Sequence, residues 1–165
     1  MQALADRRPA TTSAEIHEYR EAIKAGRTGP YGWVSLVGLR TQDPLEISQR
    51  VAKGLSFAAF ERFQRNSGLS LRDLAEAVVI APSTLHRRRQ ERRLEPQESD
   101  RLLRLSRVFG RALELCEGEV DAARQWLGAP QRALAGQRPL VLAMTDVGAR
   151  EVEALVDRLE QGVLT

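Results

Sequence analysis

The sequence predicts an all-α protein. Apolar residues recur at spacings of three and four along several stretches, capping residues precede these stretches, and glycines end them. Of the 165 residues, 42% are hydrophobic, which is enough for a packed core in one domain of ordinary size or two small ones. We find no internal repeat and no low-complexity block.

The N-terminal part of the chain gives weak signals. Residues 1–30 are polar and small, with one weak periodic segment formed by Ile16, Tyr19 and Ile23, and we interpret them as a flexible arm. Residues 33–41 contain a short apolar run that fits either a strand or a helical turn.

From residue 43 onward, start and stop signals for helices become regular. Asp43, Ser56, Ser70, Glu95 and Thr145 are predicted N-caps. Residues 128–144 are expected to form a loop fixed by prolines and a glycine. The predicted helices cover residues 44–53, Ser56 to Gly68, 71–78, Pro82 to Gln90, Pro96 to Gly118, 119–127, and the segment after Thr145.

The long helix that begins at Pro96 has an unusually broad apolar face. So broad a band usually contacts both its own domain and a further surface, such as a second copy of the chain. The residues of this face are Leu102, Leu105, Phe109, Ala112 and Cys116, with Leu103 and Leu113 beside them.

Residues 69–93 have the layout of a helix-turn-helix, in which a short helix turns into a second helix rich in arginine. Such a motif buries apolar side chains between its two helices and presents the second helix to a DNA groove. With Leu71 at the start of the first helix, the buried positions are taken by Leu74, Ala75, Val78, Ile80 and Leu85.

The second helix of this motif supplies the candidate DNA contacts. Ser83, Thr84 and Arg87 lie near its N-terminal end, where base edges are read. Cations further along the helix and beyond it are better placed to neutralise phosphates. These candidate phosphate contacts are His86, Arg88, Arg89, Arg92 and Arg93.

Two residues depart from the common motif. The turn position that is usually glycine is Val79, and a position that is usually buried and apolar is Arg88. The alternative interpretation is therefore a scaffold that no longer touches DNA, with its arginines solvated or paired with nearby acids. Those acids are Glu91, Glu95 and Glu98.

The two parts of the chain differ in charge. Residues 112–165 carry five arginines against nine acidic residues, a net charge of −4, so the rest of the chain carries +7. This asymmetry fits one part that meets phosphate and another that meets a different partner. A bias of the genome toward arginine codons explains the excess of arginine over lysine equally well.

No pattern for catalysis, metal or cofactor binding is found, so we expect neither an enzyme nor a bound cofactor. The single cysteine, Cys116, fits a small apolar core residue in a reducing compartment. No apolar run approaches the roughly 18 residues needed to cross a membrane, and the N-terminus lacks the apolar stretch of a secretory signal. We therefore expect a cytoplasmic protein without a membrane partner.

Several short sequence elements follow one another in order between residues 55 and 165, and each would be weak alone. They are TLxRR at 84–88, Glu-Ser-Asp at 98–100, Trp-Leu at 126–127, Pro-x-x-Ala-Leu-x-Gly at 130–136, Pro-Leu at 139–140, Thr-x-x-Gly-Ala at 145–149, and Gly162. With these elements, residues 55–165 resemble the Xre/MbcA/ParS antitoxins, in which a helix-turn-helix region is joined to a C-terminal toxin-binding domain.

The resemblance implies a type II antitoxin without chemistry of its own. Its partner would be a RES-domain toxin, an enzyme resembling ADP-ribosyltransferases that consumes NAD. The antitoxin would cover the cofactor cleft of the toxin, form homodimers, and bind its own operator DNA to repress the operon.

We expect toxin contacts from the fixed loop and from the C-terminal tail, because exposed apolar side chains in an ordered loop suit the anchor of an interface. The alternative is that Trp126, Leu140 and the apolar face of the last helix fill a small core. The candidate toxin-binding residues are Trp126, Leu134, Leu140, Leu142, Val163, Leu164 and Thr165.

The expected organisation has three parts: an arm with a short apolar segment at 1–42, a helix-turn-helix domain at 43–110, and a toxin-binding domain at 111–165. Two other functions stay open. One is a stand-alone DNA-binding regulator without a toxin partner, and the other is a toxin-binding module whose helix-turn-helix no longer touches DNA.

Overall fold

The computed structural model describes residues 13–163, and every regular element within that range is a helix, which confirms the predicted all-α class. Two of the elements, η1 and η2, are 3-10 helices. In order they are α1 (Ala14–Lys24), η1 (Gly32–Val37), α2 (Pro44–Ala52), α3 (Phe57–Ser67), α4 (Leu71–Ala77), α5 (Pro82–Glu91), α6 (Pro96–Leu115), α7 (Val120–Gly128), η2 (Arg132–Leu134), α8 (Pro139–Leu142) and α9 (Asp146–Glu160).

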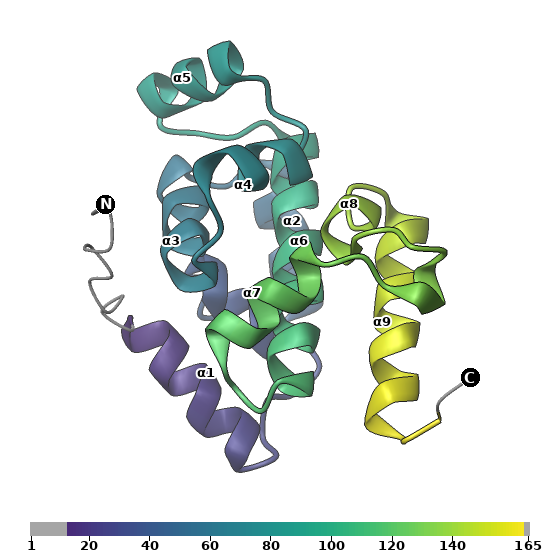
Figure 1. Cartoon of the computed structure of the whole chain (residues 1–165). Coiled ribbons are helices and arrows are strands. Elements are labelled where there is room, and N and C mark those ends of the chain that lie inside the picture. Colours follow the sequence, from purple (N-terminus) through teal and green to yellow (C-terminus); the bar gives the residue numbers. More distant parts are fainter. Residues whose placement is uncertain (1–12, 164–165) are drawn as a thin grey trace, which may run out of the picture.

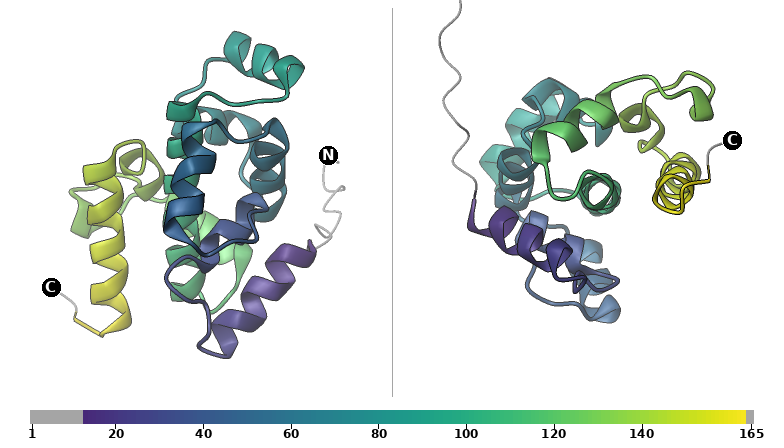
Figure 2. Two further views of the ribbon diagram at one scale, coloured as in Figure 1. Left: turned by 180° about the vertical axis from the view of Figure 1, so that it is seen from behind. Right: turned by 60° about the horizontal axis from the view of Figure 1, so that its bottom comes forward.

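The long helix α6 runs through the middle of the molecule (Figure 1). It contacts η1, α2 and α3 from the N-terminal half and α7 and α9 from the C-terminal half. The two-helix motif is at one end, with α5 outermost, while α9 stands beside α6 (Figures 1 and 2). One helix is therefore shared by both halves of the chain.

The broad apolar face of α6 is covered within the chain itself. Its large side chains, including Leu102, Leu105, Phe109 and Leu113, are 0–1% exposed. Only Cys116, at the end of the helix, is half-buried, and burial raises the pKa of its thiol. The expectation of contacts on two sides is therefore confirmed, but the further surface is α7 and α9 of the same chain rather than a second copy.

The predicted helix starts are largely confirmed. The side chains of Asp43, Ser70 and Thr145 accept hydrogen bonds from backbone N–H groups in the first turns of α2, α4 and α9, at 3.0 Å each. Glu95 is the N-cap of α6, and its backbone N–H donates to the carboxylate of Glu98 at 2.8 Å. Ser56 is the exception, because its side chain makes no capping hydrogen bond.

The N-terminal part differs from the predicted flexible arm. Residues 14–24 form α1, in which Ile16 and Tyr19 are only 2% and 3% exposed. The Tyr19 hydroxyl donates to Glu114 of α6 at 3.2 Å, and burial together with this carboxylate raises the pKa of the phenol. The weak periodicity was therefore a real helix signal, whose apolar face is completed by tertiary packing. Residues 1–12 lie outside the described part of the chain.

Two connecting segments also contain helical turns. The apolar run after residue 32 forms η1, which settles the choice between strand and helical turn. The segment 128–144 is not a plain loop, since it contains η2 and α8. Gln131 closes its middle through two backbone hydrogen bonds: its N–H donates to Gln137 O, and its carbonyl oxygen accepts from Gly136 N–H.

The burial of α1 predicts that the helix contributes to stability. Replacing Ile16 with Ala should lower the free energy of unfolding by about 2–4 kcal/mol, because it leaves a cavity under a fully buried side chain. Urea denaturation followed by circular dichroism measures this. The exposed His17→Ala is the control and should change stability by less than about 0.5 kcal/mol. Equal stability of the two variants would contradict the packing of α1.

Candidate functional site

The segment from α4 to α5 has the geometry of a helix-turn-helix. The turn closes through a hydrogen bond from Ile80 N–H to Ala75 O at 2.8 Å. Val79 adopts φ +57°, the left-handed conformation that usually favours glycine. The substitution at the glycine position therefore leaves the shape of the turn intact, at the expense of a strained β-branched residue.

The predicted inner face of this motif is confirmed. Leu74 and Val78 are 0% exposed, and Ile80, Leu85 and Ala75 are 5–9% exposed. Leu71, at the start of α4, stays 39% exposed. The apolar packing between α4 and α5 is therefore that of a DNA-binding helix-turn-helix, with α5 in the position of the recognition helix.

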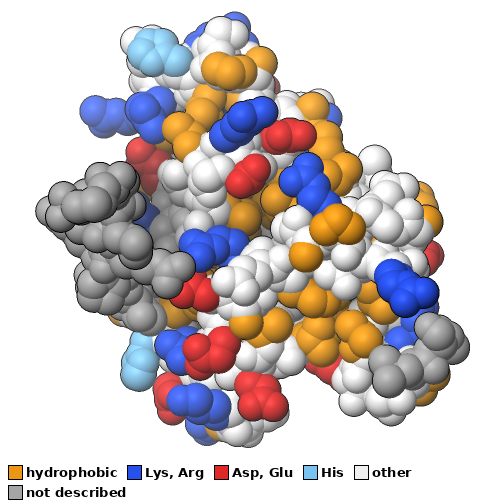
Figure 3. All heavy atoms as spheres, in the orientation of Figure 1, with side chains coloured by type: hydrophobic (Ala, Val, Ile, Leu, Met, Phe, Trp, Pro, Cys, Tyr) orange, Lys and Arg blue, Asp and Glu red, His pale blue; other side chains and the backbone are white. Residues whose placement is uncertain are grey.

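The outer face of α5 is polar and basic. Ser83 is exposed and Thr84 is half-buried in its first turn. Basic side chains surround the helix at the upper end of the molecule (Figure 3). The exposed basic candidates are His86, Arg87, Arg89, Arg92 and Arg93.

These exposed arginines have weak internal partners. Arg87 is 4.0 Å from Glu91, and Arg89 is 3.8 Å from Glu61, both pairs being about half exposed. The guanidinium of Arg89 also lies over the ring of Phe57, 5.4 Å from its centroid. Exposed pairs of this length hold their charges loosely, so a phosphate can replace the acid.

Arg88 does not belong to this exposed set. Its side chain is 9% exposed, and its Nε donates to both carboxylate oxygens of Glu98, at 3.1 and 2.8 Å. Glu91 and Glu95 also lie within ion-pair distance of it. The hydrogen bond to Glu98 raises the pKa of the guanidinium above its ordinary value. The expectation that Arg88 contacts phosphate is therefore wrong, since it links α5 to the first turn of α6.

In the C-terminal half, the structure corrects the predicted apolar patch. Leu134 and Leu140 are 7% and 6% exposed and belong to the core. Trp126 and Leu142 are half-buried and pack against that core. The segment 128–144 thus turns Leu134 and Leu140 toward the core. The expectation that these two leucines form an exposed apolar patch is therefore wrong.

The apolar face of the last helix, α9, belongs to the core, as the alternative interpretation of the sequence stated. Its Val152, Leu155 and Val156 are at most 4% exposed, while Leu159 is half-buried. Val163, just after the helix, is 48% exposed. Leu164 and Thr165, the other two tail candidates, lie outside the described residues.

A half-exposed apolar surface remains in this half of the chain. Hydrophobic side chains gather on the visible face between α7 and α9 (Figure 3). Five residues of the C-terminal half are partly buried against the core and retain some exposure: Cys116, Val120, Trp126, Leu142 and Leu159. Together with exposed Val163, they are the candidates for contact with a protein.

Sequence reasoning missed the ionic contacts that join α9 to α6. Arg107 Nε donates to Glu153, and Arg111 Nη2 donates to Asp157 at 2.5 Å and to Glu160 at 3.0 Å. Arg104 reaches Asp146 at 3.9 Å. The arginines recur at spacings of three and four on α6, which is the signal that could have indicated one basic stripe facing an acidic helix.

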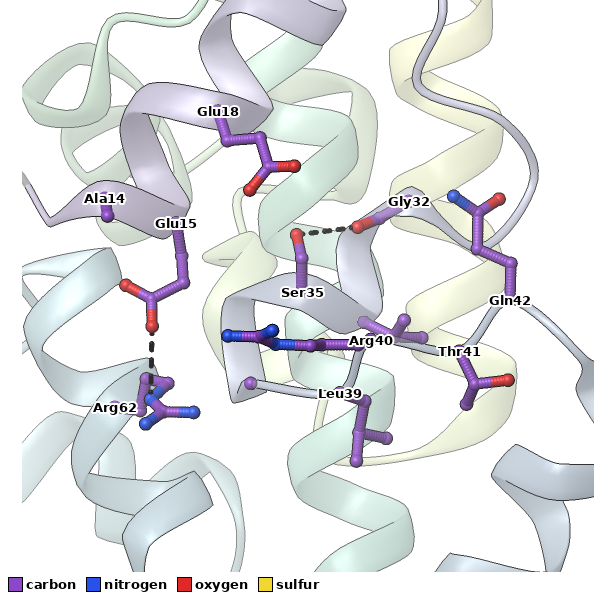
Figure 4. Close-up of a pocket in the computed structure, with 12 residues that line it drawn as sticks. Ala14, Glu15, Glu18, Gly32, Ser35, Leu39, Arg40, Thr41, Gln42 and Arg62 are labelled. Atoms are coloured by element: carbon purple, nitrogen blue, oxygen red, sulfur yellow. Dashed lines mark hydrogen bonds and ion pairs between the residues drawn. The ribbon is translucent and has the colours of Figure 1, made fainter.

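A polar hollow of about 460 Å³ lies between α1, η1 and α3 (Figure 4). Glu15 and Arg62 form an ion pair across it at 3.3 Å. Glu18 and Arg40 also line the hollow, so its two carboxylates and two guanidinium groups give it no net charge. The Ser35 hydroxyl donates to Gly32 O at 2.9 Å and has no histidine among the residues that line the hollow. This hollow therefore contains no serine–histidine pair of the kind used in nucleophilic catalysis.

Neither a metal cluster nor a membrane-spanning helix is found within residues 13–163. No group of three or more histidine, cysteine, aspartate or glutamate side chains is arranged there to hold a metal ion. None of the helices in that range combines the length and the apolar character that a membrane span requires.

The fold defines the class of protein: a small all-helical protein with a helix-turn-helix at one end and a second helical unit at the other. Comparison with known families agrees. Residues 46–107 match the antitoxin Xre-like helix-turn-helix domain, and residues 111–162 match the antitoxin Xre/MbcA/ParS C-terminal toxin-binding domain. The chain belongs to the Xre/MbcA/ParS antitoxin family.

Curated relatives support the same family over most of the chain. The antitoxin Xre of Yersinia enterocolitica is 29% identical over 130 residues, which is 78% of this chain and 88% of the relative. The antitoxin Xre of Photorhabdus laumondii is 27% identical over the same shares. That of Pseudomonas putida is 27% identical over 88% of this chain and 85% of its own length.

The buried pair of Arg88 and Glu98 predicts a contrast between single and double substitutions. Arg88→Ala should lower the free energy of unfolding by about 3–5 kcal/mol, because Glu98 is then left buried without a counter-charge. Replacing both residues with Met should cost much less. Urea denaturation measures both, with the exposed Arg87→Ala as the control. A double variant as unstable as the single one would contradict this account.

Proposed function

We propose that this chain is a type II antitoxin that binds a RES-domain toxin and represses its own operon through DNA binding. The observation that carries the proposal is the succession of an Xre-like helix-turn-helix domain and a toxin-binding domain along one chain. The two domains share α6, so one rigid element connects both binding activities.

The DNA-binding part of the proposal is supported by the exposed face of α5. We assign Ser83, Thr84 and Arg87 to base edges, because Ser83 and Thr84 lie in the first turn of the presented helix and Arg87 lies about one turn further along. The phosphate contacts are assigned to the remaining exposed basic residues. These are His86, Arg89, Arg92 and Arg93.

The toxin-binding part is supported by the half-exposed apolar surface of the C-terminal half. We assign Trp126, Leu142 and Val163 to the contact, because they are the earlier candidates that keep exposed area. Inhibition is steric in this proposal: the antitoxin covers the NAD-binding cleft of the toxin. The tail, including Leu164 and Thr165, remains a proposed contributor.

Homodimer formation is also proposed, in keeping with the pairing of helix-turn-helix readers on two half-sites. Because the apolar face of α6 is covered by other helices of the same chain, the proposed dimer contact uses a different surface. Analytical ultracentrifugation of the purified chain tests this part independently of DNA or toxin.

Removing exposed arginines from α5 should weaken DNA binding in a salt-dependent way. Each lost phosphate contact should make the log–log slope of affinity against salt less steep by about 0.9. We expect Arg89→Gln with Arg92→Gln to reduce the slope by about twice that amount, measured with a duplex taken from upstream of the gene. The charge-matched control is Arg132→Gln with Arg150→Gln, which removes two exposed arginines from the C-terminal half. Unretarded duplex at low salt with the wild-type chain would contradict the DNA-binding proposal.

Loss of the tail should weaken inhibition without preventing folding. A chain that ends at Glu160 keeps the whole of α9, so its thermal unfolding should match that of the full chain. We expect it to rescue growth less well when it is co-expressed with the toxin from the adjacent gene. Full rescue by the shortened chain would show that the tail has no inhibitory role. Failure of even the full chain to co-purify with that protein would favour a stand-alone regulator instead.

A further inference from the structure

A basic hollow lies where the loop between α2 and α3 meets the loop between α5 and α6. Its volume is about 300 Å³. Four cations line it, and no carboxylate is among its lining residues. The cations are Arg50, Lys53, Arg62 and Arg93.

Backbone contacts hold these cations together although they are distant in the sequence. Phe57 N–H donates to Arg92 O at 3.0 Å, and Leu94 N–H donates to Leu55 O at 2.9 Å. The Arg93 guanidinium also donates to Lys53 O at 2.8 Å. The two loops approach closely, because a Cβ on Gly54 would lie 2.2 Å from Leu94 O. The backbone that carries Lys53 and Arg93 is therefore held in place by these contacts.

Part of the positive charge in the hollow is not neutralised within residues 13–163. Arg50 is paired with Glu46 at 2.7 Å, and Arg62 with Glu15 at 3.3 Å. By contrast, Lys53 has no ion-pair partner among the described residues, and the hydrogen bonds of Arg93 go to carbonyl oxygens. Two cationic groups thus remain available at one site.

The donors beside these cations suit an oxyanion. Ser56 lines the hollow, and its hydroxyl makes no capping hydrogen bond. Ala58, in the first turn of α3, also lines it. Exposed ammonium and guanidinium groups with a neighbouring hydroxyl match the charge and the acceptor oxygens of a phosphate group.

We propose that this hollow binds a phosphate group and that, when the protein is on DNA, the phosphate belongs to the duplex backbone beyond the C-terminal end of α5. The assignment to DNA rests on the proposed function. Arg92 and Arg93 directly follow α5, so a duplex that accepts this helix passes the adjacent loop. Lys53, from the α2–α3 loop, then extends the contact past the helix-turn-helix itself.

The central test is Lys53→Gln, because the exposed side chain of Lys53 has no hydrogen bond or ion pair within residues 13–163 that the substitution would break, so the fold should be retained. Affinity for a duplex from upstream of the gene is measured by fluorescence anisotropy over a range of salt concentrations. We expect a roughly tenfold loss at low salt and a slope less steep by about 0.9. Lys53→Arg should keep most of the affinity, and an unrelated duplex should show the same loss.

The control for this test is Arg132→Gln, which removes one exposed positive charge from η2 in the other half of the chain. It should leave both affinity and slope unchanged. Equal effects of the two variants would mean that only net charge matters, and this result would overturn the site.

A second measurement separates the phosphate site from the DNA proposal. Inorganic phosphate alone is added to the full chain, and the amide NMR signals of Gly54 and Ala58 are followed, with Lys53→Gln as the comparison. Shifts that Lys53→Gln abolishes support the hollow even if the wild-type chain binds no duplex. Such shifts with unchanged duplex affinity would assign the hollow to a free phosphate compound and overturn its role on DNA. No shift and no loss of duplex affinity would overturn the whole inference.

Discussion

The burial of α6 from both sides is the constraint on which the rest of the structure depends. Leu102, Leu105 and Phe109 are at most 1% exposed because the N-terminal and C-terminal halves each cover part of the same helix. Each fully buried side chain of this kind contributes on the order of 2 kcal/mol. Neither half can therefore separate from α6 without exposing a large apolar surface, and this fixes the two ends of the molecule relative to each other.

Much of the fold could be predicted from the sequence because local signals determine it. Caps such as Asp43, Ser70 and Thr145 satisfy backbone donors within their own first turns, so they identify helix starts without tertiary information. The inner face of the helix-turn-helix was predictable for the same reason, since its spacing is local. Arg88 could not be placed this way, because its burial depends on Glu98, which lies on a different helix.

The remaining errors concern long-range burial. Nothing local distinguishes an exposed Leu134 or Leu140 from one turned inward, and the difference arises from packing within the C-terminal half. Likewise, α1 has a weak pattern of its own, and Tyr19 becomes buried only where Gly110 of α6 leaves room for it. Short amphipathic helices obtain most of their stability from such contacts, so sequence periodicity alone underestimates them.

The charge difference between the two halves has an origin that the structure makes clear. Several acids of α9, including Glu153, Asp157 and Glu160, face the arginines of α6, so much of the negative charge is used inside the molecule to dock α9. Arg87 and Arg89, on the exposed side of α5, have only long, exposed ion-pair partners, and their charge stays available for a polyanion. Because α6 is about 30 Å long, the basic end and the half-exposed apolar surface of the C-terminal half are held apart. In the proposed function, one molecule can therefore contact DNA and a toxin without the two partners competing for one surface.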